Sequence, residues 1–192
     1  MFSLIQGAWK TLTEVPQRKV LLLGLDGSGK TSLMEQLKLI YAGMEPLPAS
    51  KVAPTVGLNI AKFQLKKISY IVWDVGGSAS LRTLWDRYLS EADGILWVLD
   101  AGDGARADEA LETLLEILAR DEVKGKPTLI AANKEDEEDG YDLDKFAKSC
   151  FESLQGRDWK MCRCSALEGD GVKEGFDWLA EALANIEEKE SD

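Results

Sequence analysis

The 192-residue chain has 23 basic and 34 acidic residues, a net charge of −11, and no histidine. The acidic balance argues against a general nucleic-acid-binding protein, which needs clustered Lys and Arg. The missing histidine excludes histidine-based catalysis and histidine-ligated metals. Three cysteines are too few for a disulfide framework and fit a reducing compartment. The length predicts one domain with short appendages.

Short apolar runs alternate with amphipathic stretches along the chain. Strands are expected at 19–24, 59–65, 68–74, 94–100, 127–133 and 159–165, and helices at 30–41, 105–120, 143–154 and 172–186. Lys66 and Lys67 leave room only for a tight hairpin between the second and third strands. These elements predict an α/β fold with a mixed, mainly parallel six-stranded sheet and helices on both faces.

A phosphate-binding pattern, G-x-x-x-x-G-K-[ST], spans residues 24–31, between an expected strand and an expected helix. Its glycines let backbone N–H groups curl around phosphate oxygens, and the helix N-terminus adds partial positive charge. Lys30 is expected to reach the β- and γ-phosphates, and the Thr31 hydroxyl to ligate Mg²⁺. The predicted phosphate-binding residues are Asp26, Gly27, Ser28, Gly29, Lys30, Thr31 and Ser32.

A second motif, Asn-Lys-Glu-Asp at 133–136, follows an expected strand, at the position where ligands bind in open α/β sheets. The Asp136 carboxylate can accept both N–H groups at guanine N1 and N2. Adenine lacks that pair, so GTP or GDP is predicted rather than ATP. Asn133 is expected to tie this loop to its neighbours, and the Lys134 stem to cover one face of the base. Ser165 and Ala166 follow the last strand, and the Ala166 N–H is expected to donate to guanine O6.

Two further segments suit a nucleotide-dependent switch. Asp74 ends an expected strand and suits outer-shell coordination of Mg²⁺. The Gly77 N–H is expected to meet the γ-phosphate. Thr55, between Pro54 and Gly57, is the candidate second hydroxyl ligand of Mg²⁺, in a loop that closes when γ-phosphate is present. The alternative for Thr55 is an ordinary loop threonine.

The order of these motifs resembles the Arf family of small GTPases. The resemblance is carried by the phosphate-binding pattern, Pro-Thr-Val-Gly at 54–57, Trp-Asp-Val-Gly-Gly at 73–77, Asn-Lys-x-Asp at 133–136 and Cys-Ser-Ala at 164–166. The extended loop before Thr55 and a Phe at position 2 are similar to the Arf-related protein branch. The resemblance implies a small G domain over residues 17–186 that binds GTP or GDP with Mg²⁺, followed by an acidic tail over 187–192.

The resemblance also implies partners and a location. It implies an exchange factor, a GTPase-activating protein and effectors, and a cytoplasmic monomer recruited to Golgi or endosomal membranes when GTP-bound. Leu58, Trp73 and Tyr88 are expected to form an apolar effector patch on the hairpin and the following helix. The alternative for these three residues is plain hairpin or core packing. No nucleic-acid partner is expected.

The first residues have an amphipathic pattern. At about 100° per residue, one arc of a helix collects Met1, Phe2, Leu4, Ile5, Ala8, Trp9 and Leu12. An amphipathic helix is therefore expected over residues 1–16, on a membrane or docked on the domain; simple packing on the core is the alternative. Phe2 excludes N-myristoylation, which needs glycine at that position. Membrane binding is expected through residues 1–13 or a membrane receptor.

Position 78 departs from the family pattern. Family members usually carry Gln after Gly-Gly to orient the attacking water, and this chain has Ser78. The shorter side chain predicts hydrolysis that is slow or partner-dependent, with Lys30, Thr55, Gly77 and Ser78 as the catalytic set. Arg82 and Arg87 are expected on the surface of the effector helix. A GTP-binding module with essentially no hydrolysis is the alternative, and residues 133–136 argue against an ATPase or nucleotide kinase.

Overall fold

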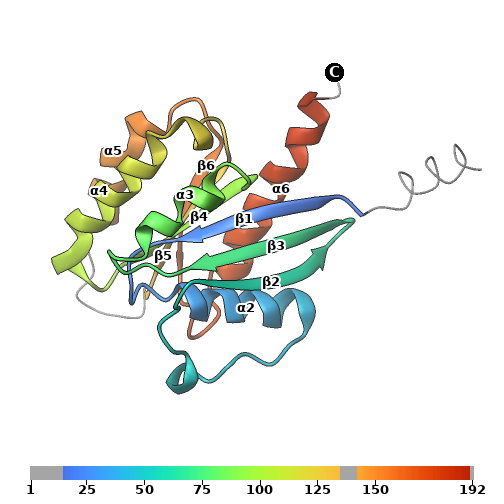
Figure 1. The fold of residues 1–192 in the computed structure, drawn as a ribbon, viewed down its shortest axis with the longest axis horizontal. Coiled ribbons are helices and arrows are strands. Elements are labelled where there is room, and N and C mark those ends of the chain that lie inside the picture. Colours follow the sequence, from blue (N-terminus) through green and yellow to red (C-terminus); the bar gives the residue numbers. More distant parts are fainter. Residues whose placement is uncertain (1–14, 135–141, 191–192) are drawn as a thin grey trace, which may run out of the picture.

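The computed structural model describes residues 15–134 and 142–190, which form one six-stranded sheet with helices on both faces (Figure 1). The strand order is β2-β3-β1-β4-β5-β6. Among these strands, β2 and β3 pair antiparallel and every other neighbouring pair is parallel. The predicted mixed, mainly parallel sheet is confirmed. The strands are β1 Gln17–Leu23, β2 Leu58–Leu65, β3 Ile68–Val75, β4 Gly94–Asp100, β5 Thr128–Asn133 and β6 Trp159–Cys164.

Of the α-helices in the described ranges, two cover one face of the sheet and three cover the other (Figure 1). The first pair is α2 Lys30–Ala42 and α6 Val172–Glu190; the other three are α3 Asp86–Leu89, α4 Ala107–Leu118 and α5 Leu143–Leu154. Successive strand residues point to opposite faces, so Val20 packs in the core under α2 and α6, while Leu21 packs under α3, α4 and α5.

Two helices, α4 and α6, begin or end at other residues than the sequence predicts. The helix expected from residue 105 begins as a 3-10 turn, Gly104–Arg106, because the Asp103 side chain accepts the Arg106 N–H at 3.2 Å. The last helix continues to Glu190, beyond its expected end at residue 186.

The expected helix over 1–16 lies almost wholly outside the described residues, as does Asp136. In the described ranges, no helix is both long enough and apolar enough to span a bilayer.

The carboxyl ends of five strands meet at one edge of the sheet. Because β1, β3, β4, β5 and β6 are parallel, the loops after Leu23, Val75, Asp100, Asn133 and Cys164 gather there. This edge is where ligands bind in open α/β sheets. It holds the motifs predicted to bind phosphate and base.

Candidate nucleotide-binding site

The phosphate loop, residues 24–31, wraps around the Lys30 ammonium group. Lys30 Nζ donates to the carbonyl oxygens of Gly24 at 3.0 Å and Leu25 at 2.6 Å, and the side chain is buried. Burial lowers the pKa of Lys30 to about 8, against the opposing effect of the nearby Asp74 charge. A phosphate anion is a stronger partner for this ammonium than a neutral carbonyl. The loop therefore holds a buried cation suited to bind phosphate.

Glycine is required where this loop approaches the next strand. Gly29 has φ 89°, and a Cβ there would lie 2.2 Å from the Asn133 amide nitrogen. Any larger residue would push the loop away from the end of β5. The glycine therefore lets the phosphate loop and the base-reading motif touch.

Three oxygen-bearing side chains from separate segments meet beside the phosphate loop. Thr31 Oγ1 donates to Asp74 Oδ2 at 2.8 Å, and Thr55 Oγ1 donates to the same oxygen at 3.1 Å. The two hydroxyl oxygens lie 2.9 Å apart. The structure thus brings together the three residues predicted to serve Mg²⁺. It places Thr55, from the first switch loop (residues 52–57), against α2 and β3.

The donor set fits a hard cation. Asp74 is fully buried, and its Oδ1 has no hydrogen-bond partner within the described part of the chain. Burial raises the pKa of Asp74, and the hydrogen bond from Thr31 opposes that rise. Mg²⁺ prefers oxygen ligands and keeps several waters and substrate phosphates in its shell. Thr31 and Thr55 would therefore hold the ion, with Asp74 in the outer shell.

A cavity of about 570 Å³ is lined by the phosphate loop, the first switch loop and the second switch segment (residues 76–82). Lys30, Thr31, Thr55, Gly77 and Ser78 all line it. A Cβ at Gly77 would lie 2.3 Å from the Gly24 carbonyl oxygen and 2.5 Å from Lys30 Nζ. The second switch segment therefore meets the phosphate loop through backbone alone, as contact with a γ-phosphate requires.

Asn133 anchors the base-reading end of the site. Its Nδ2 donates to the Ser28 carbonyl and its Oδ1 accepts the Ala166 N–H, both at 2.8 Å. In this structure the Ala166 N–H donates to Asn133, and its donation to guanine O6 stays a prediction. A buried amide oxygen needs a donor, and Ala166 supplies it. Ser165 Oγ accepts the Glu168 N–H at 3.2 Å, which gives Ser165 a role in closing its turn.

The Lys134 ammonium group forms an ion pair with Asp100, a residue that the motif analysis missed. Its Nζ donates to Asp100 Oδ2 at 2.6 Å, and its backbone has φ 67°. Asp100 ends β4, directly beside Asn133 at the end of β5. The signal in the sequence was an acidic residue at a strand end, the same signal that identified Asp74. The remaining member of the motif, Asp136, lies outside the described residues.

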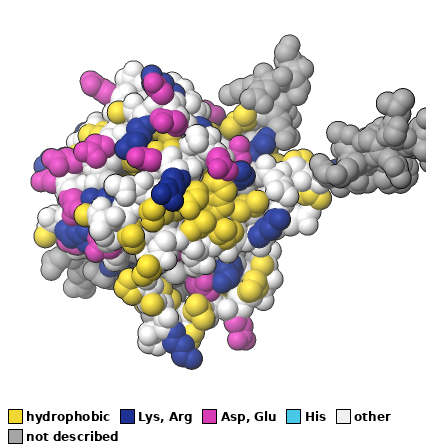
Figure 2. Space-filling view, in the orientation of Figure 1, with side chains coloured by type: hydrophobic (Ala, Val, Ile, Leu, Met, Phe, Trp, Pro, Cys, Tyr) yellow, Lys and Arg dark blue, Asp and Glu magenta, His cyan; other side chains and the backbone are white. Residues whose placement is uncertain are grey.

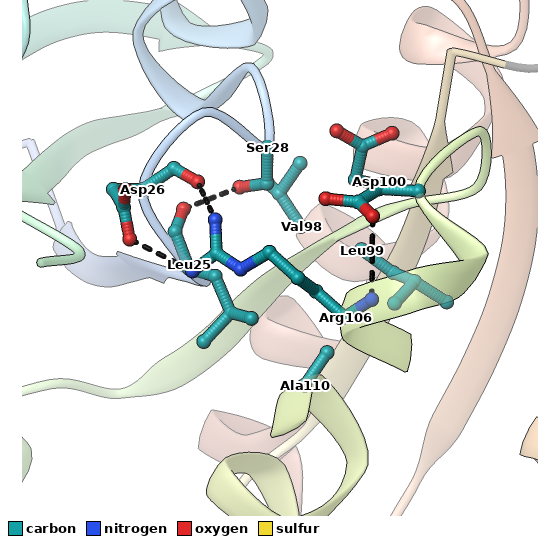
Figure 3. A pocket seen from close by; sticks show the side chains of 9 residues that line it. Leu25, Asp26, Ser28, Val98, Leu99, Asp100, Arg106 and Ala110 are labelled. Atoms are coloured by element: carbon teal, nitrogen blue, oxygen red, sulfur yellow. Dashed lines mark hydrogen bonds and ion pairs between the residues drawn. The ribbon is translucent and has the colours of Figure 1, made fainter. Parts of the chain in front are cut away.

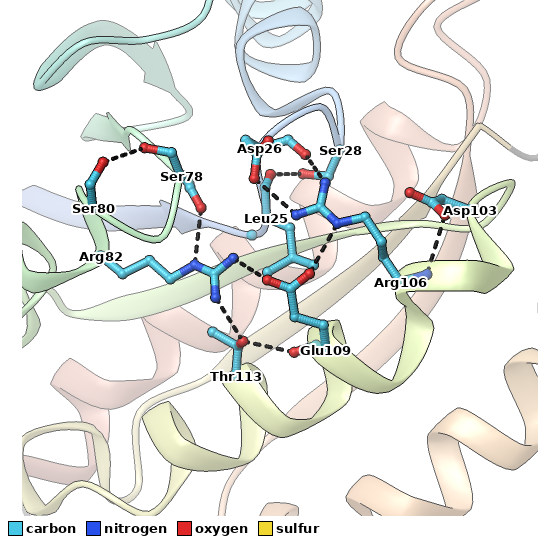
Figure 4. Close-up of polar contacts among 12 residues, drawn as sticks. Leu25, Asp26, Ser28, Ser78, Ser80, Arg82, Asp103, Arg106, Glu109 and Thr113 are labelled. Carbon is cyan, nitrogen blue, oxygen red and sulfur yellow. Dashed lines mark hydrogen bonds and ion pairs between the residues drawn. The ribbon is translucent and has the colours of Figure 1, made fainter.

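Two arginines also belong to this site. Arg82 was expected on the effector-helix surface, but its Nε donates to the Gly77 carbonyl at 3.0 Å and only 20% of its side chain is exposed (Figure 4). Arg106, from the start of α4, donates to Asp26 Oδ1 at 2.9 Å (Figure 3). This bond lowers the pKa of Asp26. No local motif marks either contact. Arg87 is exposed, as expected.

The expected effector patch is only partly exposed. Trp73 is 8% exposed because the Tyr88 ring lies 5.5 Å from it and the Lys19 ammonium 5.0 Å from its centre. Leu58 is 36% exposed, and Ile60, which pairs with Trp73 across the hairpin, is 55% exposed. Figure 2 shows hydrophobic side chains gathered over β1, β3 and β2 with basic side chains around them. The exposed apolar surface that was expected at Trp73 is therefore provided by its neighbour Ile60.

Comparison with known proteins agrees with this site. The ADP-ribosylation factor family pattern matches residues 6–183. "ADP-ribosylation factor J" of Dictyostelium discoideum is 36% identical over 186 residues, which cover 96% of this chain and 92% of that protein. "ADP-ribosylation factor-related protein 1" of Homo sapiens is 33% identical over 187 residues, covering 95% and 93%. The structure of the Arl6 small GTPase from Trypanosoma brucei with bound GppNp superposes with a TM-score of 0.77 at 27% identity, covering 88% and 98%. The chain belongs to the ADP-ribosylation factor family of small GTPases, which are GTP-dependent switches.

Proposed function

We propose that this protein is a guanine-nucleotide switch that closes its first switch loop through Thr55 and hydrolyses GTP slowly on its own. The observation that carries the proposal is the hydrogen bond that Thr55 donates to Asp74 at 3.1 Å, which places its hydroxyl oxygen 2.9 Å from that of Thr31. Thr31 and Asp74 belong to α2 and β3, so the Thr55 hydroxyl joins the loop to the cation site, beside one backbone bond from the Gly76 N–H to the Gly57 carbonyl at 3.1 Å. A loop held by so few contacts opens when the γ-phosphate leaves.

Different residues around the cavity bind different parts of a nucleoside triphosphate. Lys30 binds β- and γ-phosphate oxygens, and the Gly77 N–H donates to the γ-phosphate. Thr31 and Thr55 hold Mg²⁺, which neutralises phosphate charge when bound. Asp74 accepts a hydrogen bond from each of the two threonine hydroxyls. These bonds orient the oxygen lone pairs of the threonines toward the cavity.

Slow hydrolysis follows from Ser78. Its hydroxyl lies 3.3 Å from the Ser80 hydroxyl at the cavity wall. Serine has a donor and an acceptor but a short reach, so it orients an attacking water poorly. Arg82 does not compensate, because Gly77 and Glu109 hold its guanidinium. A GTPase-activating partner would then supply most of the catalysis, as arginine fingers do.

The nucleotide carried by the protein tests this proposal. Freshly purified full-length protein would be denatured and the released nucleotide identified by chromatography. The same protein would then be loaded with GTP and followed over hours. Guanine nucleotide with slow conversion supports the proposal. Adenine nucleotide, or no nucleotide bound in the presence of Mg²⁺, overturns it.

A GTP-binding module without hydrolysis is the second candidate function. The observation that favours it is the same short Ser78 side chain on the cavity wall. Loaded GTP that stays unconverted over days, with release only by exchange, would support the module instead of the slow enzyme.

Membrane recruitment and effector binding complete the proposal. The GTP-bound form binds Golgi or endosomal membranes through residues 1–13 or a membrane receptor, and binds trafficking effectors at Leu58, Ile60 and Tyr88. Support comes from the amphipathic pattern of residues 1–12 and from the exposure of Leu58 and Ile60. A fluorescent fusion locked with a non-hydrolysable analogue tests this in permeabilised cells. Recruitment that persists after deletion of residues 1–13 would exclude a role for that segment.

A further inference from the structure

One carboxylate on α4 is shared by two arginines. Glu109 Oε1 accepts from Arg82 at 2.6 Å, and Glu109 Oε2 accepts from Arg106 Nε at 3.0 Å (Figure 4). Each carboxylate oxygen therefore has its own guanidinium partner. The hydrogen bond from Arg82 is the main reason that the pKa of Glu109 lies below its ordinary value, so the carboxylate stays charged at neutral pH.

The other ends of the two guanidinium groups hold two different phosphate-contacting segments. Arg82 Nε donates to the Gly77 carbonyl at 3.0 Å, in the second switch segment. Arg106 donates to the Asp26 carbonyl at 3.0 Å and to its carboxylate at 2.9 Å, in the phosphate loop (Figure 3). Gly77 and Asp26 line the same cavity. A chain of hydrogen bonds, Gly77–Arg82–Glu109–Arg106–Asp26, thus runs from one wall of the cavity to the other.

The middle of this chain is fixed to α4. Thr113 Oγ1 donates to the Glu109 carbonyl at 2.7 Å and accepts from Arg82 at 3.4 Å. Arg82 therefore has two partners on α4, Glu109 and Thr113, that depend on the second switch segment lying against this helix. If that segment moves away with Gly77 and Arg82, both contacts to α4 are lost together, whereas the bonds between Arg106 and Asp26 remain.

We propose that Glu109 is a positioning residue that couples the second switch segment to the phosphate loop and thereby favours the triphosphate-bound form. The proposal rests on the proposed function, in which the Gly77 N–H meets the γ-phosphate. Contacts made only when Gly77 faces the phosphate loop stabilise that state alone. By linkage, whatever stabilises one state raises the affinity for the ligand that selects it.

Dissociation of two nucleotides from the full chain tests the coupling. N-methylanthraniloyl derivatives of GDP and GppNHp would be bound in Mg²⁺ and chased with unlabelled nucleotide. The Glu109→Gln variant is expected to release the triphosphate analogue roughly fivefold faster, while GDP release changes less than about twofold. Glu116→Gln, an exposed glutamate two turns further along α4, is the matched control. It should release both nucleotides as the wild type does.

Further variants separate positioning from general stability. The effect of Arg82→Gln combined with Glu109→Gln should be smaller than the sum of the two single effects, because contacting residues in one network are not additive. The GDP-bound variants should melt at the wild-type temperature. Equal acceleration of both nucleotides, or of neither, overturns the coupling while the wild type still binds both. A wild type that retains neither nucleotide overturns the proposed function, and the coupling with it.

Discussion

Asn133 and Ser28 are joined by a 2.8 Å hydrogen bond from the Asn133 amide to the Ser28 carbonyl, which ties the end of β5 to the phosphate loop. Both residues are 2% exposed. The other amide atom of Asn133 accepts the Ala166 N–H. One side chain therefore holds together three loops at the carboxyl edge of the sheet, so the phosphate and base regions of the site are positioned as a unit.

Removing this side chain should damage both stability and nucleotide binding. Asn133→Ala leaves the Ser28 carbonyl and the Ala166 N–H buried without partners, at about 1–3 kcal/mol each. We expect the free energy of unfolding of the GDP-bound protein to fall by about 3 kcal/mol, measured by urea denaturation at fixed nucleotide concentration. Asn185→Ala, at an exposed site on α6, should change it by less than about 0.5 kcal/mol. Equal midpoints for the two variants would contradict the anchoring role.

Thr55 should discriminate between the two nucleotides. It joins Thr31 and Asp74 only when the first switch loop is closed, so Thr55→Ala should weaken triphosphate binding by about tenfold and leave GDP binding unchanged. Chelation of Mg²⁺ should speed release of both nucleotides in the wild type, because Thr31 serves the ion in both forms. Equilibrium titration with fluorescent GppNHp and GDP measures the effect. Thr83→Ala, an exposed threonine outside the cavity, is the control, and a GDP defect in Thr55→Ala would contradict the assignment.

Ser78 should limit hydrolysis without limiting binding. A glutamine at this position reaches further and can hold the attacking water, so Ser78→Gln should raise the single-turnover rate of GTP hydrolysis by about tenfold or more. Its affinity for GTP should stay within about twofold. Ser80→Gln places the same amide two residues away, at an exposed position, and should have little effect. A wild type that hydrolyses GTP as fast as Ser78→Gln would refute the role given to this position.

The predictions that held rest on local pattern. Short apolar runs located the strands, most clearly β4 and β5, because a strand buried on both faces needs an uninterrupted apolar run. Gly24 to Thr31 could be placed between a strand and a helix because the motif carries its own backbone requirements. Lys66 and Lys67 located the hairpin because nothing longer fits between the two strands.

The predictions that failed depended on contacts between distant segments. Nothing near Arg82 in the sequence indicates that Glu109, on another helix, holds its guanidinium. The contact between the Ala166 N–H and the Asn133 amide oxygen likewise joins distant segments and has no signal in the local sequence. Trp73 was assigned to a surface patch, but its burial is set by Tyr88 and Lys19, which pack on it from other elements.

The cysteines should be unreactive in the folded protein. Burial raises the pKa of Cys150 to about 12 and that of Cys162 to about 11. Because the thiolate is the reactive form, iodoacetamide at pH 8 should label the native GDP-bound protein slowly, beginning at the partly exposed Cys162. In urea all three cysteines should react within minutes, as mass spectrometry would show. Fast labelling of Cys150 in the native protein would contradict its burial.

The buried thiol of Cys150 also predicts how stability depends on alkaline pH. Its pKa rises from an ordinary value of 9.0 to about 12 in the folded state, so between these values unfolding releases a proton. The stability present below pH 9 is therefore lost progressively as the pH rises toward 12, and this single group should account for about 1.4 kcal/mol between pH 8 and pH 10. Urea denaturation of the wild type and of Cys150→Ala at both pH values isolates the contribution of Cys150 ionisation to the free energy of unfolding. The cavity left by the substitution lowers that free energy by the same amount at pH 8 and at pH 10, so it cancels in the comparison. The variant should lose less stability than the wild type on going to pH 10, and equal losses would show that the folded-state pKa of Cys150 is not raised.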